Sequence, residues 1–389
     1  MIPLVGMEDI HFTPGTLPPE TAALRAQIRE FLAEHLSEYP NVKRAQSWSG
    51  SDRAFSKLMG AHGFIGMTWP KKYGGGERSA LERYVMLEEM LAAGAPVAAH
   101  WVADRQSGPL LLNFGTEQQR QRFLPAITRG ESYFCIGMSE PNSGSDLASI
   151  RTNGKHTKDG WRINGSKIWT SKAHISTFMI ALIRTQPQDH KNRHAGLSQF
   201  LIDMETPGIT VRPIQNMAGE SMFNEVFFDD VLVPDDMLVG TEGGGWGQVT
   251  TELAYERSGP ERYLSSIQLI YELIHELSKN PTERSAIGIG RLIAHLGTLR
   301  QMSMSVAKML EAGESPNLAA ALVKELGVGF EQEIPSRAYE LTGRVPLLGD
   351  GNDFDQVMAY ITQATRSFSL RGGTREIMRG IIARGLGLR

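Results

Sequence analysis

The chain has 389 residues, more than one hydrophobic core usually supports, so its length predicts two or three domains. Its 40 Lys and Arg against 43 Asp and Glu give a net charge of −3, which argues against a general attraction to nucleic acid or anionic membranes. The single cysteine, Cys135, excludes an internal disulfide and a cysteine-rich metal site. There is no basic leader and no run of about 18 apolar residues. We therefore expect a cytoplasmic protein with no membrane or nucleic-acid partner.

The first part of the chain has the apolar spacing of α-helices. Between about residues 18 and 130, apolar side chains recur on one helical face, as in the set Leu24, Ile28, Phe31 and Leu32. Thr116, with Gln119 three residues later, forms a capping box that predicts a short helix ending near Pro125. The sequence thus predicts an all-α domain over residues 1–132.

Near Tyr133 the apolar period changes from that of helices to that of strands. Residues 161–163 and 167–169 alternate on either side of Asn164-Gly165, a pair that favours a type I′ hairpin turn. Further strand-like runs follow at 178–183, 200–203 and 226–233. We therefore expect a small antiparallel β domain over residues 133–238.

Four glycines within residues 243–247 mark the next boundary, because glycine favours neither regular structure. Helical spacing then returns, first in an apolar stripe that comprises Ile267, Ile270, Tyr271, Ile274 and Leu277. Further helices are predicted at 284–312, 317–341, 353–368 and 374–386. The sequence thus predicts a four-helix-bundle-like domain over residues 239–389. The whole chain is expected to have an α+β fold, in the order α, β, α.

Two segments of the β domain have the composition of a flavin site. The run from Met138 to Asp146 is rich in small hydroxyl residues, proline and glycine, which can present backbone N–H groups to a ligand. Farther along, Trp169 offers a flat apolar face beside the hydroxyls of Thr170 and Ser171. Because an isoalloxazine ring needs both a stacking surface and hydrogen-bond donors, these segments predict a flavoenzyme.

With these motifs in this order, the chain resembles the acyl-CoA dehydrogenase family along almost its entire length. The resemblance is carried by Met138 to Asp146, Ile163 to Ser171, Glu256-Arg257, Arg284 and the Gly-Thr-Arg-Glu-Ile segment at 373–377. It implies FAD as the cofactor, with Met138 and Ser139 at the flavin pyrimidine, Ser171 at N5 and Trp169 packed against the ring. The cofactor-binding residues that we expect on this basis are Ile136, Met138, Ser139, Ser145, Trp169, Thr170, Ser171, Arg284, Ile287, Thr374 and Glu376.

The resemblance also implies an assembly of subunits. Arg284 would reach the FAD pyrophosphate of a neighbouring subunit, and Thr374 with Glu376 would hold the cofactor at its other end. A shared site of this kind implies a homo-oligomer, either a dimer or a tetramer. Ile287 stands where the family often has Phe, and Tyr339 to Gly343 replaces a Gln-x-x-Gly-Gly segment, so contacts on the adenine side are expected to differ.

The implied reaction is the α,β-dehydrogenation of an acyl-CoA thioester. A carboxylate takes the α-proton, the β-hydrogen leaves as hydride to flavin N5, and the electrons pass to an electron-transfer flavoprotein. Many relatives carry the base immediately before the C-terminal Gly-Thr, but this position is Gly372, which can only donate a main-chain N–H to the thioester oxygen. In a subgroup resembling isovaleryl-CoA and long-chain acyl-CoA dehydrogenases, the base lies on a helix before an Arg, as Glu256 does before Arg257.

We therefore predict Glu256 as the catalytic base and Gly372 as the N–H donor. The substrate-binding residues that we expect are Ser145, Tyr255, Arg257 and Gly373. In the family, a helix-borne base accompanies branched or long acyl groups, so the resemblance implies a branched or bulky substrate. Two alternatives are a flavin monooxygenase on the same fold and, given Gly372, a catalytically silent subunit of a hetero-oligomeric dehydrogenase. His190 and His194 have helical spacing but lie in a polar loop without a third ligand, so we expect no metal site.

Overall fold

The computed structural model describes residues 11–388 except 14, 190, 348 and 350, and for residues 251–256 it describes the backbone alone. The chain forms two compact units, which we describe separately. The first unit comprises residues 1–50, 78–96 and 254–389, and the second comprises residues 51–77 and 97–253.

A twisted sheet forms the core of the second unit. Its strands run in the order β6-β7-β3-β2-β4-β5-β8, and β1 pairs with β4. Most pairs are antiparallel, as expected, whereas β1 and β2 each run parallel to β4. The strands are β1 (Phe134–Gly137), β2 (Asn153–Thr157), β3 (Gly160–Lys167), β4 (Phe178–Arg184), β5 (Leu197–Asp203), β6 (Ile209–Ile214), β7 (Phe223–Val233) and β8 (Leu238–Val239).

The predicted hairpin at Asn164-Gly165 is wrong, because β3 continues through both residues. The pairing of β3 with β7 shifts between Ile163 and Gly165, which is the mark of a β-bulge. Gly165 has φ +141°, and a Cβ there would lie 2.6 Å from the Thr152 hydroxyl oxygen. Between these pairs β3 advances by two residues and β7 by three, so the bulge lies in β7, and Asn164-Gly165 lies opposite it in a continuous strand rather than in a turn.

Five α-helices lie wholly or mostly in the described part of the second unit: α3 (Arg53–Ala61), α5 (Ala98–Val102), α6 (Gly108–Phe114), α7 (Glu117–Thr128) and α8 (Gly245–Glu256), whose last three residues belong to the first unit. The capping box at Thr116 and Gln119 is confirmed. Its helix α7 continues three residues past Pro125, and buried Phe123, Leu124 and Ile127 pack its inner face. Helix α8 begins inside the glycine run. A Cβ at Gly245 would lie 2.8 Å from the Leu197 carbonyl oxygen, so the glycine permits close approach to β5.

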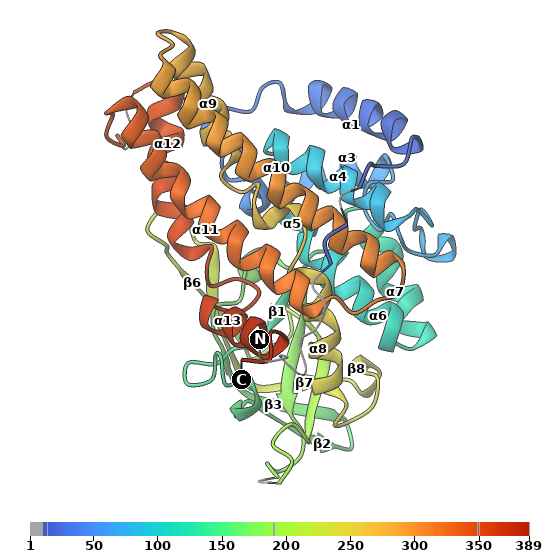
Figure 1. Cartoon of the computed structure of the whole chain (residues 1–389). Helices are drawn as coiled ribbons and strands as arrows, with labels where there is room; N and C mark the ends of the chain where they lie inside the picture. The colour runs from blue at the N-terminus through green and yellow to red at the C-terminus, as the bar shows by residue number, and fades with distance from the viewer. Residues whose placement is uncertain (1–10, 14, 190, 348, 350, 389) are drawn as a thin grey trace. The chain divides into compact units, whose positions relative to one another are not determined.

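The first unit is helical. Long helices α10 and α11 lie side by side in it (Figure 1), as a bundle requires. The predicted stripe of α9 is confirmed for Ile267 and Ile270, which are buried, but is wrong for Tyr271, which is 46% exposed. The helices are α1 (Glu20–Leu36), α2 (Asn41–Arg44), α4 (Ala80–Ala93), α9 (Ile267–Ser278), α10 (Glu283–Glu311), α11 (Asn317–Thr342), α12 (Asp353–Ala364) and α13 (Arg375–Gly385).

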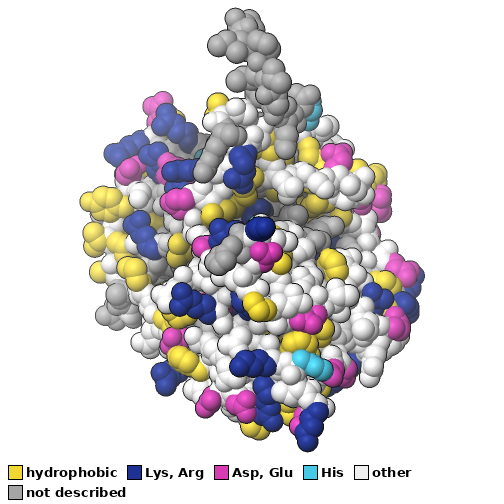
Figure 2. Space-filling view, turned by 90° about the horizontal axis from the view of Figure 1, so that it is seen from below, with side chains coloured by type: hydrophobic (Ala, Val, Ile, Leu, Met, Phe, Trp, Pro, Cys, Tyr) yellow, Lys and Arg dark blue, Asp and Glu magenta, His cyan; other side chains and the backbone are white. Residues whose placement is uncertain are grey.

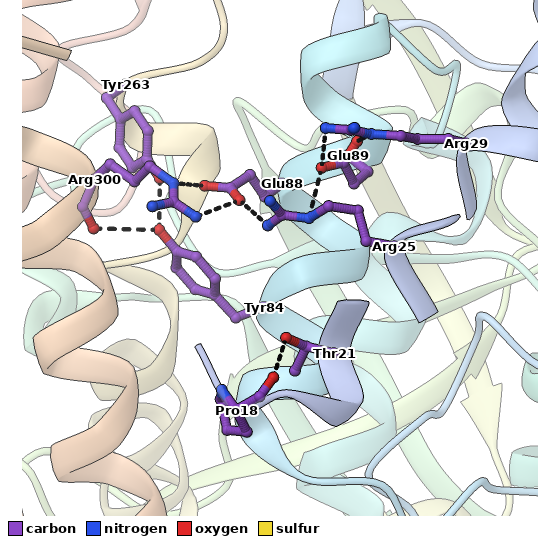
Figure 3. A network of polar contacts seen from close by, with 9 residues as sticks. All are labelled: Pro18, Thr21, Arg25, Arg29, Tyr84, Glu88, Glu89, Tyr263 and Arg300. Carbon is purple, nitrogen blue, oxygen red and sulfur yellow. Dashed lines mark hydrogen bonds and ion pairs between the residues drawn. The ribbon is translucent and has the colours of Figure 1, made fainter. Parts of the chain in front are cut away.

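A network of ion pairs ties α1, α4 and α10 together (Figure 3). Glu88 of α4 accepts from Arg300 Nε at 2.5 Å and from Arg25 Nη2 at 2.9 Å. Beside it, the hydroxyls of Tyr84 and Tyr263 lie 2.6 Å apart, and burial raises the pKa of both phenols. Because each charge has a partner, this network anchors the helices without leaving an isolated buried charge.

Among the described residues, no helix combines the length and apolar character needed to cross a bilayer. On the face drawn in Figure 2, acidic and basic side chains are interspersed rather than separated into fields of one sign. This agrees with the near balance of charges in the sequence.

Candidate functional site

The segment from Met138 to Asp146, which we call the 138–146 loop, starts where β1 ends. Glu140 and Ser143 each donate a backbone N–H to the other's carbonyl at 3.0 Å, which closes a tight turn. Beyond the turn, Ser145 is exposed, and a Cβ added at Gly144 would meet nothing within 4 Å. The outer side of the loop is therefore accessible to a ligand.

The segment from Trp169 to Lys172 is held in an uncommon backbone conformation. Trp169 and Lys172 have φ of +61° and +56°, values that non-glycine residues rarely adopt unless the surroundings impose them. Asn224, which is fully buried at the start of β7, holds the middle of this segment. Its carbonyl accepts from the Thr170 N–H at 3.0 Å, and its Nδ2 donates to the Thr170 carbonyl at 2.9 Å. The backbone around Thr170 and Ser171 is thus fixed by protein contacts alone.

The side chains of this segment fit an aromatic ligand that carries hydrogen-bonding groups. Trp169 is 57% exposed and meets the ring of Phe223 edge to face, with centroids 6.1 Å apart. The Thr170 hydroxyl is buried and lacks a hydrogen-bond partner among the described residues, which is a costly arrangement unless a ligand supplies one. Ser171 is half-buried beside it. An open indole face next to such hydroxyls is what an isoalloxazine ring requires.

The structure brings these two segments together, as the sequence analysis expected. The Ile168 N–H, just before Trp169, donates to the Ser139 carbonyl at 2.9 Å. The two segments, which contain Met138, Ser139, Trp169, Thr170 and Ser171, therefore lie side by side in the second unit and form one candidate site. Ile136, also an expected cofactor residue, is half-buried on β1 immediately before the loop.

In the first unit, a second group of expected residues surrounds the loop that precedes α13. Gly372 and Gly373 have φ of +67° and +96°, a backbone conformation that favours glycine at both positions. Arg257 Nε donates to the Gly372 carbonyl oxygen at 3.3 Å. Lys324, buried on α11, donates to the carbonyls of Ser369 and Gly373. The structure therefore brings the residue after Glu256 to the position where many relatives carry the base.

The residue before Gly372 is fixed by a buried ion pair. Arg371 Nη2 lies 2.7 Å from the Glu331 carboxylate, and the guanidinium stacks on the rings of Trp48 and Phe368 at 4.8 and 4.3 Å. Burial raises the pKa of Glu331 and lowers the pKa of Arg371 to about 10. Each group opposes the shift that burial causes in the pKa of the other.

The other expected residues lie at helix ends or outside the described side chains. Arg284 and Ile287 are exposed on α10, and Arg284 Nη2 donates to the Glu340 carbonyl at 2.8 Å. Thr374 is the N-cap of α13, where a main-chain hydrogen bond lowers the pKa of Glu376. Glu256 and Tyr255 end α8, and their side chains lie outside the described part of the chain.

Of the two histidines considered as metal ligands, His194 lies in the described part of the chain. His194 stacks on Trp246, with centroids 4.0 Å apart and planes 10° from parallel. His190 lies outside the described residues.

The sequence analysis missed the residues that hold the site from behind. These are Lys167 beneath the 138–146 loop with its partner Glu140 in the loop, Asn224 beneath Thr170, and Lys324 and Glu331 behind residues 369–373. One signal was available for Lys167, because it lies in phase with buried Ile163 on β3. A lysine at an inward position of a strand indicates a buried partner.

Comparisons with known proteins agree with this architecture. Three family models match: acyl-CoA dehydrogenase N-terminal domain at 18–131, middle domain at 135–231 and C-terminal domain at 243–387. Acyl-CoA dehydrogenase IpdE1 of Mycobacterium tuberculosis is 35% identical, with 94% of this chain and 97% of the relative covered. Acyl-CoA dehydrogenase FadE34 of the same organism is 32% identical over 94% of this chain, which spans only about half, 48%, of that relative. The structure of the Tcur3481-Tcur3483 steroid ACAD has 27% identity and a TM-score of 0.86, covering 96% of this chain and 98% of that one.

Proposed function

Because the chain belongs to the acyl-CoA dehydrogenase family of FAD-dependent oxidoreductases, we propose that it dehydrogenates an acyl-CoA thioester to the trans-2-enoyl-CoA with Glu256 as its base. The observation that carries this proposal is the hydrogen bond from Arg257 Nε to the Gly372 carbonyl at 3.3 Å. It supports a site in which the end of α8 supplies the carboxylate that Gly372 lacks.

The residues of the first unit have two tasks in this reaction. Glu256 takes the α-proton of the acyl group, which is too weakly acidic to be removed unless the developing enolate is stabilised. The main-chain N–H of Gly372 donates to the thioester oxygen and supplies that stabilisation. When bound, FAD supplies the acceptor for the β-hydrogen, which leaves as hydride. Tyr255, Arg257, Gly373 and Ser145 are the residues proposed to bind the substrate.

FAD contacts are proposed for the residues expected from the sequence. Ile136, Met138, Ser139, Ser145, Trp169, Thr170 and Ser171 would hold the isoalloxazine end, which the unpartnered Thr170 hydroxyl and the open face of Trp169 support. Arg284, Ile287, Thr374 and Glu376 would hold the remainder across a subunit interface.

An oligomer is supported by the surface of α10. Ala286, Ile287, Gly290, Ile293, Ala294 and Gly297 make an exposed face of apolar and small side chains next to Arg284. We propose that this face meets a second copy in a homodimer or homotetramer. The name of the steroid ACAD joins two different chains, so a hetero-oligomer is the competing assembly. Light scattering of the purified chain distinguishes them, because a chain that requires a partner stays monomeric and binds FAD poorly when alone.

The proposed substrates are branched or bulky acyl-CoAs. Gly372 presents no side chain where other members carry a carboxylate, and the similar Tcur3481-Tcur3483 protein is named a steroid ACAD. An electron-transfer flavoprotein is the proposed acceptor, in the cytoplasm.

Anaerobic titration tests this function. The purified protein, with its FAD absorbance near 450 nm recorded, is mixed with short, long, branched and ring-bearing acyl-CoAs. Bleaching by one class, with formation of the enoyl-CoA, would establish both the reaction and the substrate. Bound FAD that no acyl-CoA bleaches would instead favour the monooxygenase or the silent subunit.

A further inference from the structure

Lys167, the last residue of β3, is completely buried although it carries an ammonium group. Its side chain passes over the end of β1. A Cβ added at Gly137 would lie 3.3 Å from Lys167 Cγ and 2.6 Å from Met179 Sδ. The glycine therefore leaves room for the lysine to reach the 138–146 loop from beneath.

The ammonium group of Lys167 makes two hydrogen bonds to the start of this loop. Nζ donates to the Met138 carbonyl at 3.0 Å and to Glu140 Oε1 at 2.9 Å. The N–H of the next residue, Ile168, donates to the Ser139 carbonyl at 2.9 Å. Lys167 and Ile168 thus hold Met138, Ser139 and Glu140, three consecutive residues of the loop.

Glu140 offsets the free-energy cost of burying the charged Lys167 ammonium group. Its carboxylate also accepts from the backbone N–H groups of Arg151 at 2.7 Å and Thr152 at 2.9 Å. Burial lowers the pKa of Lys167 to about 8, and Glu140 opposes that shift. Burial alone would raise the pKa of Glu140, but Lys167 and the two N–H groups lower it overall. Each charge is therefore balanced, as a buried ion pair requires.

The direction of the Met138 carbonyl decides where the next N–H points. No described peptide bond is cis, and in a trans peptide the C=O and the following N–H point in opposite directions. Because the Met138 carbonyl turns inward to Lys167, the Ser139 N–H must turn away from Lys167. A ligand that accepts a hydrogen bond from the Ser139 N–H must therefore approach from the side away from Lys167.

We propose that Lys167 is a positioning residue for FAD, which fixes the Met138–Ser139 peptide so that the Ser139 N–H is aimed at the cofactor before it binds. This inference rests on the proposed placement of the flavin pyrimidine at Met138 and Ser139. The pair with Glu140 has no net charge, so Lys167 acts through geometry.

The test compares FAD affinity in two variants that each lose one cation of a buried or half-buried ion pair. Lys167→Met keeps the length of the side chain but removes the donor to the Met138 carbonyl. Quenching of FAD fluorescence by the apoprotein should show binding about 10- to 100-fold weaker than wild type, the loss expected when a hydrogen bond from a charged group is removed. The control is Arg300→Met, which removes a cation from the Glu88 network of the first unit (Figure 3). This control should lower thermal stability and leave FAD affinity unchanged.

Two further measurements keep the proposal falsifiable if Lys167→Met does not fold. The double variant Lys167→Met, Glu140→Gln leaves no unpaired buried charge and should still bind FAD at least about 10-fold more weakly than wild type. In the wild-type apoprotein, the hydrogen-bonded amides of Glu140, Ser143 and Ile168 should be protected from hydrogen exchange before FAD is added. Wild-type affinity in either variant, or exchange of those amides at the rate of an unstructured chain, would overturn the proposal.

The results also distinguish a failure of this inference from a failure of the proposed function. If wild type binds FAD and is bleached by an acyl-CoA but the Lys167 variants bind FAD equally well, only the role of Lys167 fails. If wild type itself does not bind FAD, the proposed cofactor site fails and the inference fails with it.

Discussion

Arg257 donates a hydrogen bond to the Gly372 carbonyl across 115 residues of sequence. The contact joins the residue that follows α8 to the loop that precedes α13. In the family pattern these are the two alternative places for the catalytic base, one on a helix and one before the Gly-Thr motif. Their contact supports the proposal that Glu256, next to Arg257, takes the role that a carboxylate at position 372 has in many relatives.

Replacing Glu256 by Gln should abolish bleaching of FAD by the acyl-CoA substrate. A positioned general base contributes roughly 10²- to 10⁴-fold to the rate, and an amide cannot take the proton. The rate is measured by anaerobic stopped-flow absorbance at 450 nm, and FAD should remain bound. The matched control is Glu252→Gln, one turn earlier on α8, which should bleach as wild type does. Normal bleaching by the Glu256 variant would remove Glu256 as the base.

Gly372→Ala should reduce turnover more than its effect on stability explains. A left-handed conformation costs a non-glycine residue about 1 kcal/mol or more, and the strain would displace the N–H proposed to bind the thioester oxygen. Gly313→Ala is the control, because Gly313 has φ +78° and open space around its Cβ position. Both variants should lose similar stability in urea unfolding. Equal kcat in the two variants would contradict the role of Gly372.

Arg284→Met should weaken FAD binding without changing KM for the acyl-CoA. A hydrogen bond from a charged group contributes about 1.5–3 kcal/mol, which corresponds to about a 10- to 100-fold loss of affinity. FAD dissociation is followed by fluorescence in the oligomer. Arg291, also exposed on α10, provides the control variant Arg291→Met, whose affinity should match wild type. Equal losses in both variants would indicate a general charge effect.

His100 should make the protein less stable in mild acid. Burial lowers the pKa of His100 from 6.5 to about 4, while Asp104 opposes that shift, and its Nδ1 lies 2.8 Å from the Ser56 hydroxyl. Between these values the unfolded chain binds a proton that the folded chain does not, so stability falls as pH decreases from about 6.5 to about 4.

The His100 contribution lost over that range is roughly 3 kcal/mol. Urea unfolding at a series of pH values should show the decrease in wild type and a shallower one in His100→Gln. Between pH 7 and 8, where His100 is neutral in both states, the two proteins should have parallel profiles. Parallel profiles in acid as well would disprove the assignment.

Local patterns in the sequence sufficed for the order of the elements. The capping box at Thr116, the stripe of α9 and the 138–146 loop are encoded within a few residues, since helical and strand periodicity and turn chemistry are local properties. Local patterns were insufficient at Asn164-Gly165. Whether this pair makes a turn or continues a strand depends on β2 and β7, the strands that pair with β3 on its two sides.

Only the tertiary structure decided which residues hold the site in place. Lys167 reaches Glu140 and the Met138 carbonyl, Asn224 reaches Thr170, and Arg257 reaches Gly372, each from a distant part of the sequence. A buried polar group must find a partner, but its own sequence neighbourhood does not say which one. That choice is made when the segments pack, because burial removes water as the alternative partner.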